Sequence, residues 1–125
     1  MAEAPSALRK TVLILEDEVP FRQLIAEALS YEGFAVIEAG TGDEALHILL
    51  GSPPLDLALI DVRVPGSIDG LDLARRIRAE WPQLKVVLMS GYLKDMAKAE
   101  VADAFLGKPF PLQAVIDCVK RLLGI

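Results

Sequence analysis

The chain has 125 residues, which is the size of one domain with its own core, and 53% of them are apolar. Its formal net charge of −5 argues against binding to a nucleic-acid backbone, which needs clustered basic residues. No apolar run approaches the ~18 residues that a membrane helix requires. The single cysteine, Cys118, excludes an internal disulfide and fits a reducing cytoplasm. We therefore expect a cytoplasmic protein with a protein partner, and neither nucleic acid nor membrane bound by this chain.

Residues 1–9 are expected to form a flexible tail and residues 10–125 a single domain. The stretch from Met1 to Lys10 has no apolar segment behind a basic head, so it does not resemble a secretion signal. The sequence predicts only one helix after Lys108, which leaves no room for a DNA-binding or enzymatic module. A domain that acts by docking on another protein is the expectation.

The first half of the chain predicts strands that alternate with helices. Short continuous apolar runs indicate buried strands, and apolar residues three and four positions apart indicate helices. Proline suits the first turn of a helix, glycine its end, and Thr41 with Glu44 forms a capping-box pattern. The predicted elements are the strand Thr11–Leu15, a helix from Pro20 to Gly33, the strand Phe34–Glu38, a helix opened by Thr41, and the strand Leu55–Ile60.

The second half continues the same alternation. A helix with Leu71, Ile77 and Trp81 on its apolar stripe is expected to end before Pro82. Arg75, Arg76 and Arg78 are expected on the solvated face of this helix. His47 is expected near the apolar stripe of its own helix, in a structural role. The remaining predicted elements are the strand Lys85–Met89, a short and weakly marked helix Leu93–Glu100, the strand Ala102–Leu106, and a last helix that starts near Pro111.

This order predicts an α/β fold, a doubly wound five-stranded parallel sheet with five helices. Parallel strands need crossover connections, and helices usually provide them. The uniformly apolar run Leu55–Ile60 indicates a strand that is covered on both faces, as parallel sheets are. Ligands of such sheets bind beyond the carboxyl ends of the strands.

Polar residues follow the predicted strands at that same end. Glu16 and Asp17 follow the first strand, Asp61 the third, Ser90 the fourth and Lys108 the fifth. Three carboxylates at one point repel each other unless a cation neutralises them, and oxygen ligands select a hard ion such as Mg²⁺. Phosphoryl transfer depends mostly on positioning and charge neutralisation. These residues therefore predict a site for Mg²⁺ and a phosphoryl group, with Lys108 and Ser90 contacting the phosphoryl oxygens.

Short motifs in strand context carry a resemblance to a known family. From about Lys10 onward the chain resembles the receiver domain of response regulators in two-component signalling, of the single-domain type. Each motif is weak alone, but their order along the chain makes them specific together. The motifs are Leu15-Glu16-Asp17-Glu18, residues 40–46, Asp61 with Pro65-Gly66 and Asp69-Gly70, Met89-Ser90-Gly91, and residues 105–110.

The resemblance implies a role for each matching residue. Asp61 would take a phosphoryl group from the phosphohistidine of a histidine kinase or a histidine phosphotransfer protein. Glu16, Asp17, Asp61 and the carbonyl of Arg63 would hold Mg²⁺. Ser90 would be the switch hydroxyl and Lys108 the phosphate-pairing lysine, with a cis bond to Pro109. The aromatic residue whose rotamer reports the switch would be Phe105, although a plain core aromatic is an equal alternative.

The chain also departs from the family pattern. Glu16 stands where aspartate is also common, the loop holds Ser67-Ile68 where one residue is more usual, and the segment from Ser90 to Lys108 is short. The shortening affects the fourth helix and, with it, the usual signalling face. No enzymatic turnover is expected beyond self-catalysed phosphotransfer and slow dephosphorylation, and the chain is expected to be a monomer or a phosphorylation-dependent dimer.

Four alternatives stay open from the sequence. The chain is compatible with a receiver fragment of a hybrid histidine kinase, or with a degenerate receiver that is not phosphorylated. An aspartate-based phosphatase or phosphotransferase needs a second carboxylate two residues after Asp61, where Arg63 stands. A flavin-binding module needs a phosphate loop after the first strand, where Glu16, Asp17 and Glu18 would repel phosphate.

Overall fold

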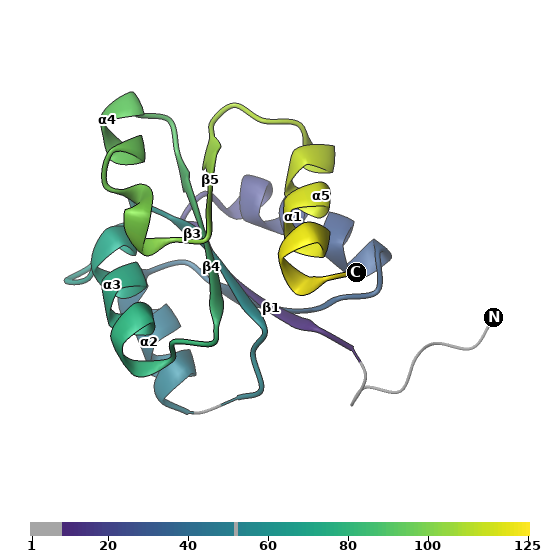
Figure 1. The fold of residues 1–125 in the computed structure, drawn as a ribbon, viewed down its shortest axis with the longest axis horizontal. Coiled ribbons are helices and arrows are strands. Elements are labelled where there is room, and N and C mark those ends of the chain that lie inside the picture. Colours follow the sequence, from purple (N-terminus) through teal and green to yellow (C-terminus); the bar gives the residue numbers. More distant parts are fainter. Residues whose placement is uncertain (1–8, 52) are drawn as a thin grey trace.

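Five parallel strands form one sheet in the order β2-β1-β3-β4-β5, with helices on both faces (Figure 1). This computed structural model describes residues 9–51 and 53–125, so most of the expected tail, residues 1–8, lies outside the described residues. The doubly wound sheet predicted from the alternation is confirmed. The strands are β1 (Thr11–Leu15), β2 (Ala35–Ala39), β3 (Leu57–Asp61), β4 (Lys85–Ser90) and β5 (Ala104–Gly107).

The helices divide between the two faces of this sheet. Helices α1 and α5 lie together on one face, and α2 and α3 cover the other (Figure 1). The short α4 stands beside the end of β4, and a 3₁₀ turn, η2, follows it. The bounds are α1 (Val19–Tyr31), α2 (Gly42–Leu50), α3 (Gly70–Glu80), α4 (Leu93–Met96), η2 (Ala99–Val101) and α5 (Leu112–Leu123).

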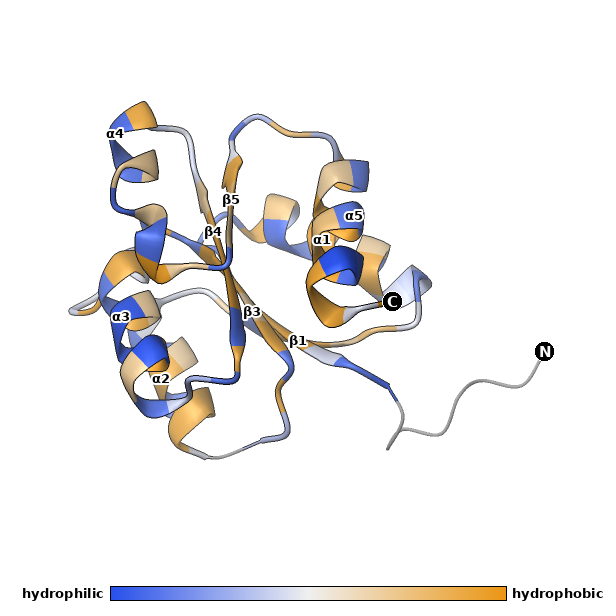
Figure 2. Cartoon of the chain, viewed as in Figure 1, coloured by the Kyte–Doolittle hydropathy of each residue, from blue (hydrophilic) through white to orange (hydrophobic). Residues whose placement is uncertain are grey.

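The central strands of the sheet contribute side chains to two separate cores. Along β1, Leu13 and Leu15 face the α2–α3 side, and Val12 and Ile14 face the α1–α5 side, all fully buried. Figure 2 shows the same pattern as mostly apolar strands between helices that carry both apolar and polar residues. A strand that is covered on both faces has no polar alternation, which is why the apolar runs are continuous.

The strand register aligns the functional ends of the sheet. Leu15 pairs with Ile60, so Glu16 comes beside Asp61, and Asp61 itself pairs with Met89. Ser90 then pairs with Gly107 at the end of β5. The predicted convergence at one edge therefore follows from the pairing of the backbone.

Several predicted boundaries need correction. The strand predicted at Leu55–Ile60 runs instead from Leu57 to Asp61, and Asp56 lies just before it, where its side chain accepts a hydrogen bond from the backbone of Thr11. The helix predicted over Leu93–Glu100 is only α4 followed by η2, and β5 begins two residues later than predicted. β2 starts at Ala35 rather than Phe34. Among the described residues, none of the helices combines the length and apolar character needed to cross a bilayer.

Candidate functional site

A pocket of acidic side chains lies at the carboxyl edge of the sheet. Glu16 follows β1 and Asp61 is the last residue of β3, and their side chains are 1% and 6% exposed. Asp17 is exposed beside them. One carboxylate oxygen from each of the three lies within 4.8 Å of the others. The structure thus brings together the three acids that the sequence singled out.

Lys108 joins two of these acids. Its Nζ donates to Glu16 Oε1 at 2.7 Å and to Asp61 Oδ2 at 2.8 Å. The Lys108 backbone N–H donates to the carbonyl of Ser90 at 2.8 Å. This hydrogen bond extends the β4–β5 pairing and fixes the position of the Lys108 backbone. The ammonium also lies 5.1 Å from the ring centroid of Phe21 on α1. The Lys108–Pro109 bond is cis, as the resemblance implied.

Burial and hydrogen bonding act in opposite directions on the charged groups of this pocket. Burial raises the pKa of Glu16 to about 7, although hydrogen bonds from Lys108 and from the Glu18 backbone act in the opposite direction. Burial alone would lower the pKa of Lys108, but its hydrogen bonds to Asp61 and Glu16 outweigh this and raise it. The lysine therefore stays charged, while Glu16 holds a proton more tightly than an exposed glutamate.

The donor set of the pocket fits a hard divalent ion. Three carboxylates face one ammonium, so the site has an excess of negative charge that a divalent cation would balance. All three side chains supply oxygen, which Mg²⁺ prefers over nitrogen or sulfur ligands. The backbone N–H of Arg63 donates to Asp61 Oδ1 at 3.0 Å and orients that carboxylate. The predicted role of the Arg63 carbonyl as a ligand stays a prediction.

Ser90 ends β4 and is 1% exposed, and its hydroxyl is bound to the α4 segment. Its Oγ donates to Asp95 Oδ2 at 2.5 Å and accepts from the backbone N–H of Tyr92 at 3.0 Å. Asp95 belongs to α4 and is itself 3% exposed. Sequence analysis did not identify Asp95, because a lone aspartate in a weakly marked helix gave no signal of burial.

Arg63 also has a side-chain role that the sequence did not indicate. Its guanidinium binds the Asp95 carboxylate through two hydrogen bonds, Nε–Oδ2 at 3.1 Å and Nη2–Oδ1 at 3.0 Å. The hydrogen bond from Arg63 is the main cause that lowers the pKa of Asp95. The Tyr92 ring lies 4.3 Å from the guanidinium carbon. A hollow of about 630 Å³ beside the acids is lined by Arg63, Asp95 and Asp17, among others.

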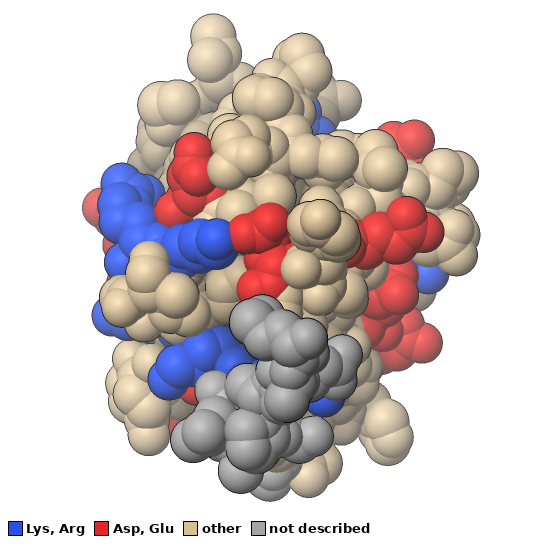
Figure 3. Space-filling model, turned by 90° about the vertical axis from the view of Figure 1, so that its right-hand side faces the viewer, with Lys and Arg blue, Asp and Glu red and all other residues tan. Residues whose placement is uncertain are grey.

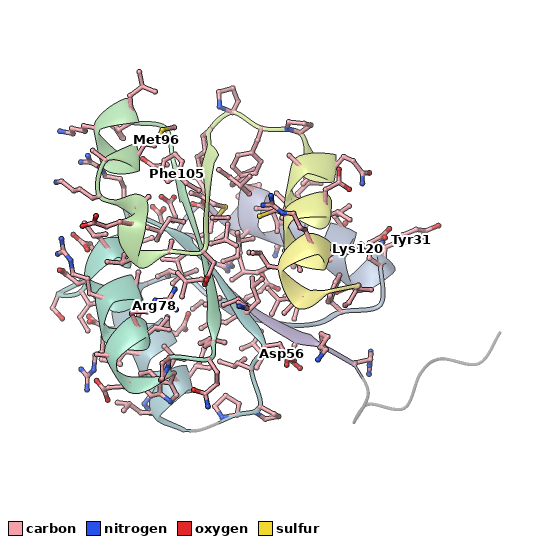
Figure 4. The ribbon with its side chains drawn as sticks, viewed as in Figure 1. Tyr31, Asp56, Arg78, Met96, Phe105 and Lys120 are labelled. Atoms are coloured by element: carbon pink, nitrogen blue, oxygen red, sulfur yellow. The ribbon has the colours of Figure 1, made fainter. Side chains whose placement is uncertain are left out.

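The other residues singled out have more ordinary surroundings. Phe105 is partly buried and packs against the core on the α2–α3 side (Figure 4), so both its roles, switch and core aromatic, stay open. His47 is exposed on α2 rather than near its apolar stripe. Arg78, expected on a solvated face, instead binds Asp103 and the carbonyl of Val101. Cys118 is buried in α5, as expected of a small apolar residue.

Comparisons with known proteins agree with this geometry. A family model described as "Response regulator receiver domain" matches residues 12–120. Sporulation initiation phosphotransferase F of Bacillus subtilis is 31% identical, over 94% of this chain and 97% of its own length. Sensor kinase CckA of Brucella abortus is 40% identical over 90% of this chain, which spans only 12% of that protein. The chain also spans about half the length of two further relatives, 49% of a probable transcriptional regulatory protein of Mycobacterium tuberculosis and 46% of a response regulator of Aneurinibacillus migulanus.

Solved structures give the same result. The response regulator TrrA of Thermotoga maritima, in complex with Mg²⁺ and beryllofluoride, superposes with a TM-score of 0.83 at 31% identity. The match covers 90% of this chain and 98% of that one. A receiver domain of Methanospirillum hungatei superposes with a TM-score of 0.85 at 26% identity, over 93% and 94% of the two chains.

Proposed function

The chain belongs to the response regulator receiver domain family, and on that premise we propose that Asp61 accepts a phosphoryl group with the help of Mg²⁺. The observation that carries this proposal is the placement of Lys108 between Glu16 and Asp61, beside the exposed carboxylate of Asp17. Such a site combines an acceptor oxygen, a cation for the phosphoryl oxygens and ligands for a divalent ion.

The residues of the chain divide the chemistry between them. Glu16, Asp17 and Asp61, with the Arg63 carbonyl, would hold Mg²⁺, which neutralises charge between the acceptor and the incoming phosphoryl group. An Asp61 carboxylate oxygen bonds to phosphorus as the phosphorus–nitrogen bond of a phosphohistidine breaks, and the imidazole leaves. Lys108 keeps its proton and pairs with the phosphoryl oxygens. Ser90 then donates its hydroxyl to one of them, and Phe105 is the proposed reporter of that movement.

A histidine kinase or a histidine phosphotransfer protein is the proposed donor, and a partner protein the proposed target. Two relatives support this setting, since one is a sensor kinase and another a sporulation phosphotransferase. Because receivers of both arrangements match, a free-standing protein and a receiver segment of a larger kinase are both compatible with the chain. We place this exchange in the cytoplasm, where the buried thiol of Cys118 would stay reduced.

The first test is labelling by a small phosphodonor. Incubation with acetyl phosphate and Mg²⁺ should add one phosphoryl group per chain, measured by intact-protein mass spectrometry. Asp61→Asn should abolish labelling while the circular dichroism spectrum is unchanged. Asp117→Asn is the matched control, because Asp117 is an exposed aspartate on α5. Undiminished labelling of Asp61→Asn would show that another residue is the acceptor.

The same reaction separates a receiver from an aspartate-based phosphatase. A receiver consumes about one acetyl phosphate per chain and then reacts only as slowly as its acyl phosphate hydrolyses. A phosphatase releases phosphate over many turnovers, which needs a general acid near the acceptor. The side chain two residues after Asp61 is Arg63, which is paired with Asp95 and cannot serve as that acid. Rapid, sustained phosphate release would overturn the proposal.

A further inference from the structure

The hydroxyl of Ser90 is held by a buried carboxylate on α4. Ser90 Oγ donates to Asp95 Oδ2 at 2.5 Å, and the two residues are only 1% and 3% exposed. A hydrogen bond from a hydroxyl to a carboxylate is charge-assisted and stronger than a neutral one. Ser90 Oγ also accepts a hydrogen bond from the Tyr92 backbone N–H at 3.0 Å, so the hydroxyl group is held both as a donor and as an acceptor.

Asp95 is in turn held by Arg63. The two hydrogen bonds between their side chains, at 3.1 and 3.0 Å, form a bidentate pair with little freedom to rotate. The Tyr92 ring lies over the guanidinium, 4.3 Å from its carbon. Ser90, Tyr92, Asp95 and Arg63 therefore form one connected group, which we call the α4 latch. It ties α4 to the ends of β3 and β4.

We propose that Asp95 is a positioning residue that keeps the switch hydroxyl bound to α4, and that phosphorylation of Asp61 must open the α4 latch. A serine hydroxyl has one proton, so it cannot donate to Asp95 and to a phosphoryl oxygen at the same time. This inference rests on the proposed function, because the competing acceptor is a phosphoryl group on Asp61.

The loop after β3 connects the acceptor directly to the latch. Arg63 is two residues beyond Asp61, and its backbone N–H donates to Asp61 Oδ1 at 3.0 Å. A phosphoryl group on Asp61 adds a charge of about −1.5 to −2 two residues before Arg63, whose side chain is 44% exposed. That charge competes with Asp95 for the guanidinium while it competes for the Ser90 proton. Both attractions favour the open latch, and release of Asp95 frees α4.

The inference predicts that weakening the latch strengthens the binding of a phosphoryl mimic. Asp95→Asn removes the charge of the carboxylate but keeps its shape, so Ser90 and Arg63 lose their strongest partner. The affinity for beryllofluoride at saturating Mg²⁺, measured by titration with NMR detection, should rise about tenfold, within the usual range of coupling between two sites. In a Ser90→Ala background the same substitution should raise the affinity clearly less, because only the Arg63 guanidinium is then left to release.

This double-mutant cycle separates positioning from a merely structural role. If Asp95 only stabilised α4, Asp95→Asn would change the affinity equally in both backgrounds, and that result would overturn the inference. Asp103→Asn is the matched control. Asp103 pairs with Arg78 (Figure 4) at 3.0 Å and accepts from the backbone of Val86, and it has no part in the latch. It should leave the affinity unchanged.

A measurement on the unmodified chain covers the case in which Asp95→Asn does not fold. Bound beryllofluoride should draw the Ser90 hydroxyl away, so the Tyr92 backbone N–H loses its acceptor and its hydrogen exchange should accelerate at least about tenfold. Unchanged exchange at full occupancy would contradict the latch. Failure of the unmodified chain to bind beryllofluoride with Mg²⁺ would instead contradict the proposed function, so the two failures can be told apart.

Discussion

Glu16 lies almost entirely out of solvent, yet it faces a second buried carboxylate, Asp61, across the ammonium of Lys108. Without a metal ion, burial favours its neutral form, which is why its pKa rises to about 7. With a metal ion, the charged form is required. Glu16 thus resists ionisation in the metal-free site, whereas metal binding requires its ionised form.

Glu16→Gln is expected to affect metal binding far more than folding. Glutamine keeps the size of the side chain and can still accept from Lys108, so the free energy of unfolding in EDTA should change by less than about 1 kcal/mol. The loss of one charged ligand should weaken Mg²⁺ binding at least about tenfold, or about 1.4 kcal/mol. Calorimetric titration with Mg²⁺ at neutral pH measures the effect.

Glu27→Gln provides the control, since Glu27 is an exposed residue on the outer surface of α1. It should leave Mg²⁺ affinity unchanged within error. Equal Mg²⁺ affinities of Glu16→Gln and the unmodified chain would remove Glu16 from the proposed ligand set, which would then consist of Asp17, Asp61 and the Arg63 carbonyl.

At the residue scale, the sequence predicted the acids and the lysine because each follows an apolar run of strand length. Parallel strands bring such positions to one edge whatever the details of packing. The α4 latch had no such signal. Arg63 and Asp95 are 32 positions apart, and their pairing depends on how α4 turns back over the β3 end. Neither spacing nor residue type indicates which of several aspartates such a turn will bury.

Among the elements, the start of α3 is packed closely against the site. Asp69 caps the helix by accepting from the Asp72 backbone at 2.8 Å, and the Asp72 side chain accepts from the Asp69 backbone. Gly70, the first residue of the helix, is buried and donates to the carbonyl of Val62 at 3.0 Å. A Cβ at position 70 would overlap the carbonyl oxygen of Asp61. Only glycine permits this close approach.

Gly70→Ala is therefore expected to destabilise the fold and to displace the Asp61 backbone. The added Cβ would overlap main-chain atoms of Asp61 and Val62, which no side-chain rotation can move, so relief requires movement of the helix or the strand end, at a cost of roughly 1–3 kcal/mol or more. Urea unfolding should show the loss of stability, and acetyl phosphate labelling of the folded fraction should slow.

Gly51→Ala tests whether any glycine replacement would do the same. Gly51 ends α2 with φ −75°, and a Cβ there would meet the nearest carbonyl oxygen at 3.4 Å, close to ordinary contact. We expect an unchanged or slightly higher free energy of unfolding, by up to about 1 kcal/mol. A loss at position 51 as large as at position 70 would contradict the steric argument.

Element order could be read from the sequence, but the extent of α4 could not. Helices α1, α2, α3 and α5 have apolar stripes that pack on the sheet, and the spacing of these apolar residues in the sequence predicted the four helices. The α4 segment leaves Leu93 and Met96 exposed, 87% and 55%, and buries Asp95 instead. Its position is set by a polar contact with Ser90 and Arg63, which apolar periodicity does not encode. This is why the predicted helix Leu93–Glu100 was too long.

At the scale of the whole molecule, charge is distributed unevenly over the surface. Figure 3 views the molecule from the side of α1 and α5 and shows acidic groups across this face, with basic groups gathered toward one side. Lys120 on α5 pairs with Glu32 at the end of α1, which fastens these two helices at the surface. This pair adds nothing to the overall charge of −5, whereas the acidic pocket, with three carboxylates and one ammonium, contributes to it.

The stability of the metal-free protein should fall as the pH rises from about 4.5 to about 7. Glu16 has a pKa of about 7 in the folded chain and 4.5 as an ordinary glutamate, so folding takes up a proton in this window. Its contribution is complete below about pH 4.5 and is lost by about pH 7, on the order of 1–3 kcal/mol. Asp95 and Asp103 have lowered pKa values, so their contributions decline only at more acidic pH. The raised pKa of Lys108 places its own decline in alkaline solution.

Mg²⁺ should reverse this trend, because the ion requires the charged form of Glu16 and stabilises the folded state more as that form becomes available. Urea unfolding in EDTA and at a fixed, excess Mg²⁺ concentration, at several pH values between about 5 and about 8, should give curves that diverge as the pH rises. Glu16→Gln in EDTA should show a flatter pH dependence, since the titrating group is gone. A metal-free stability of the unmodified chain that rises steadily through this window would mean that Glu16 ionises as easily as an exposed glutamate, and that Lys108 fully offsets the effect of its burial.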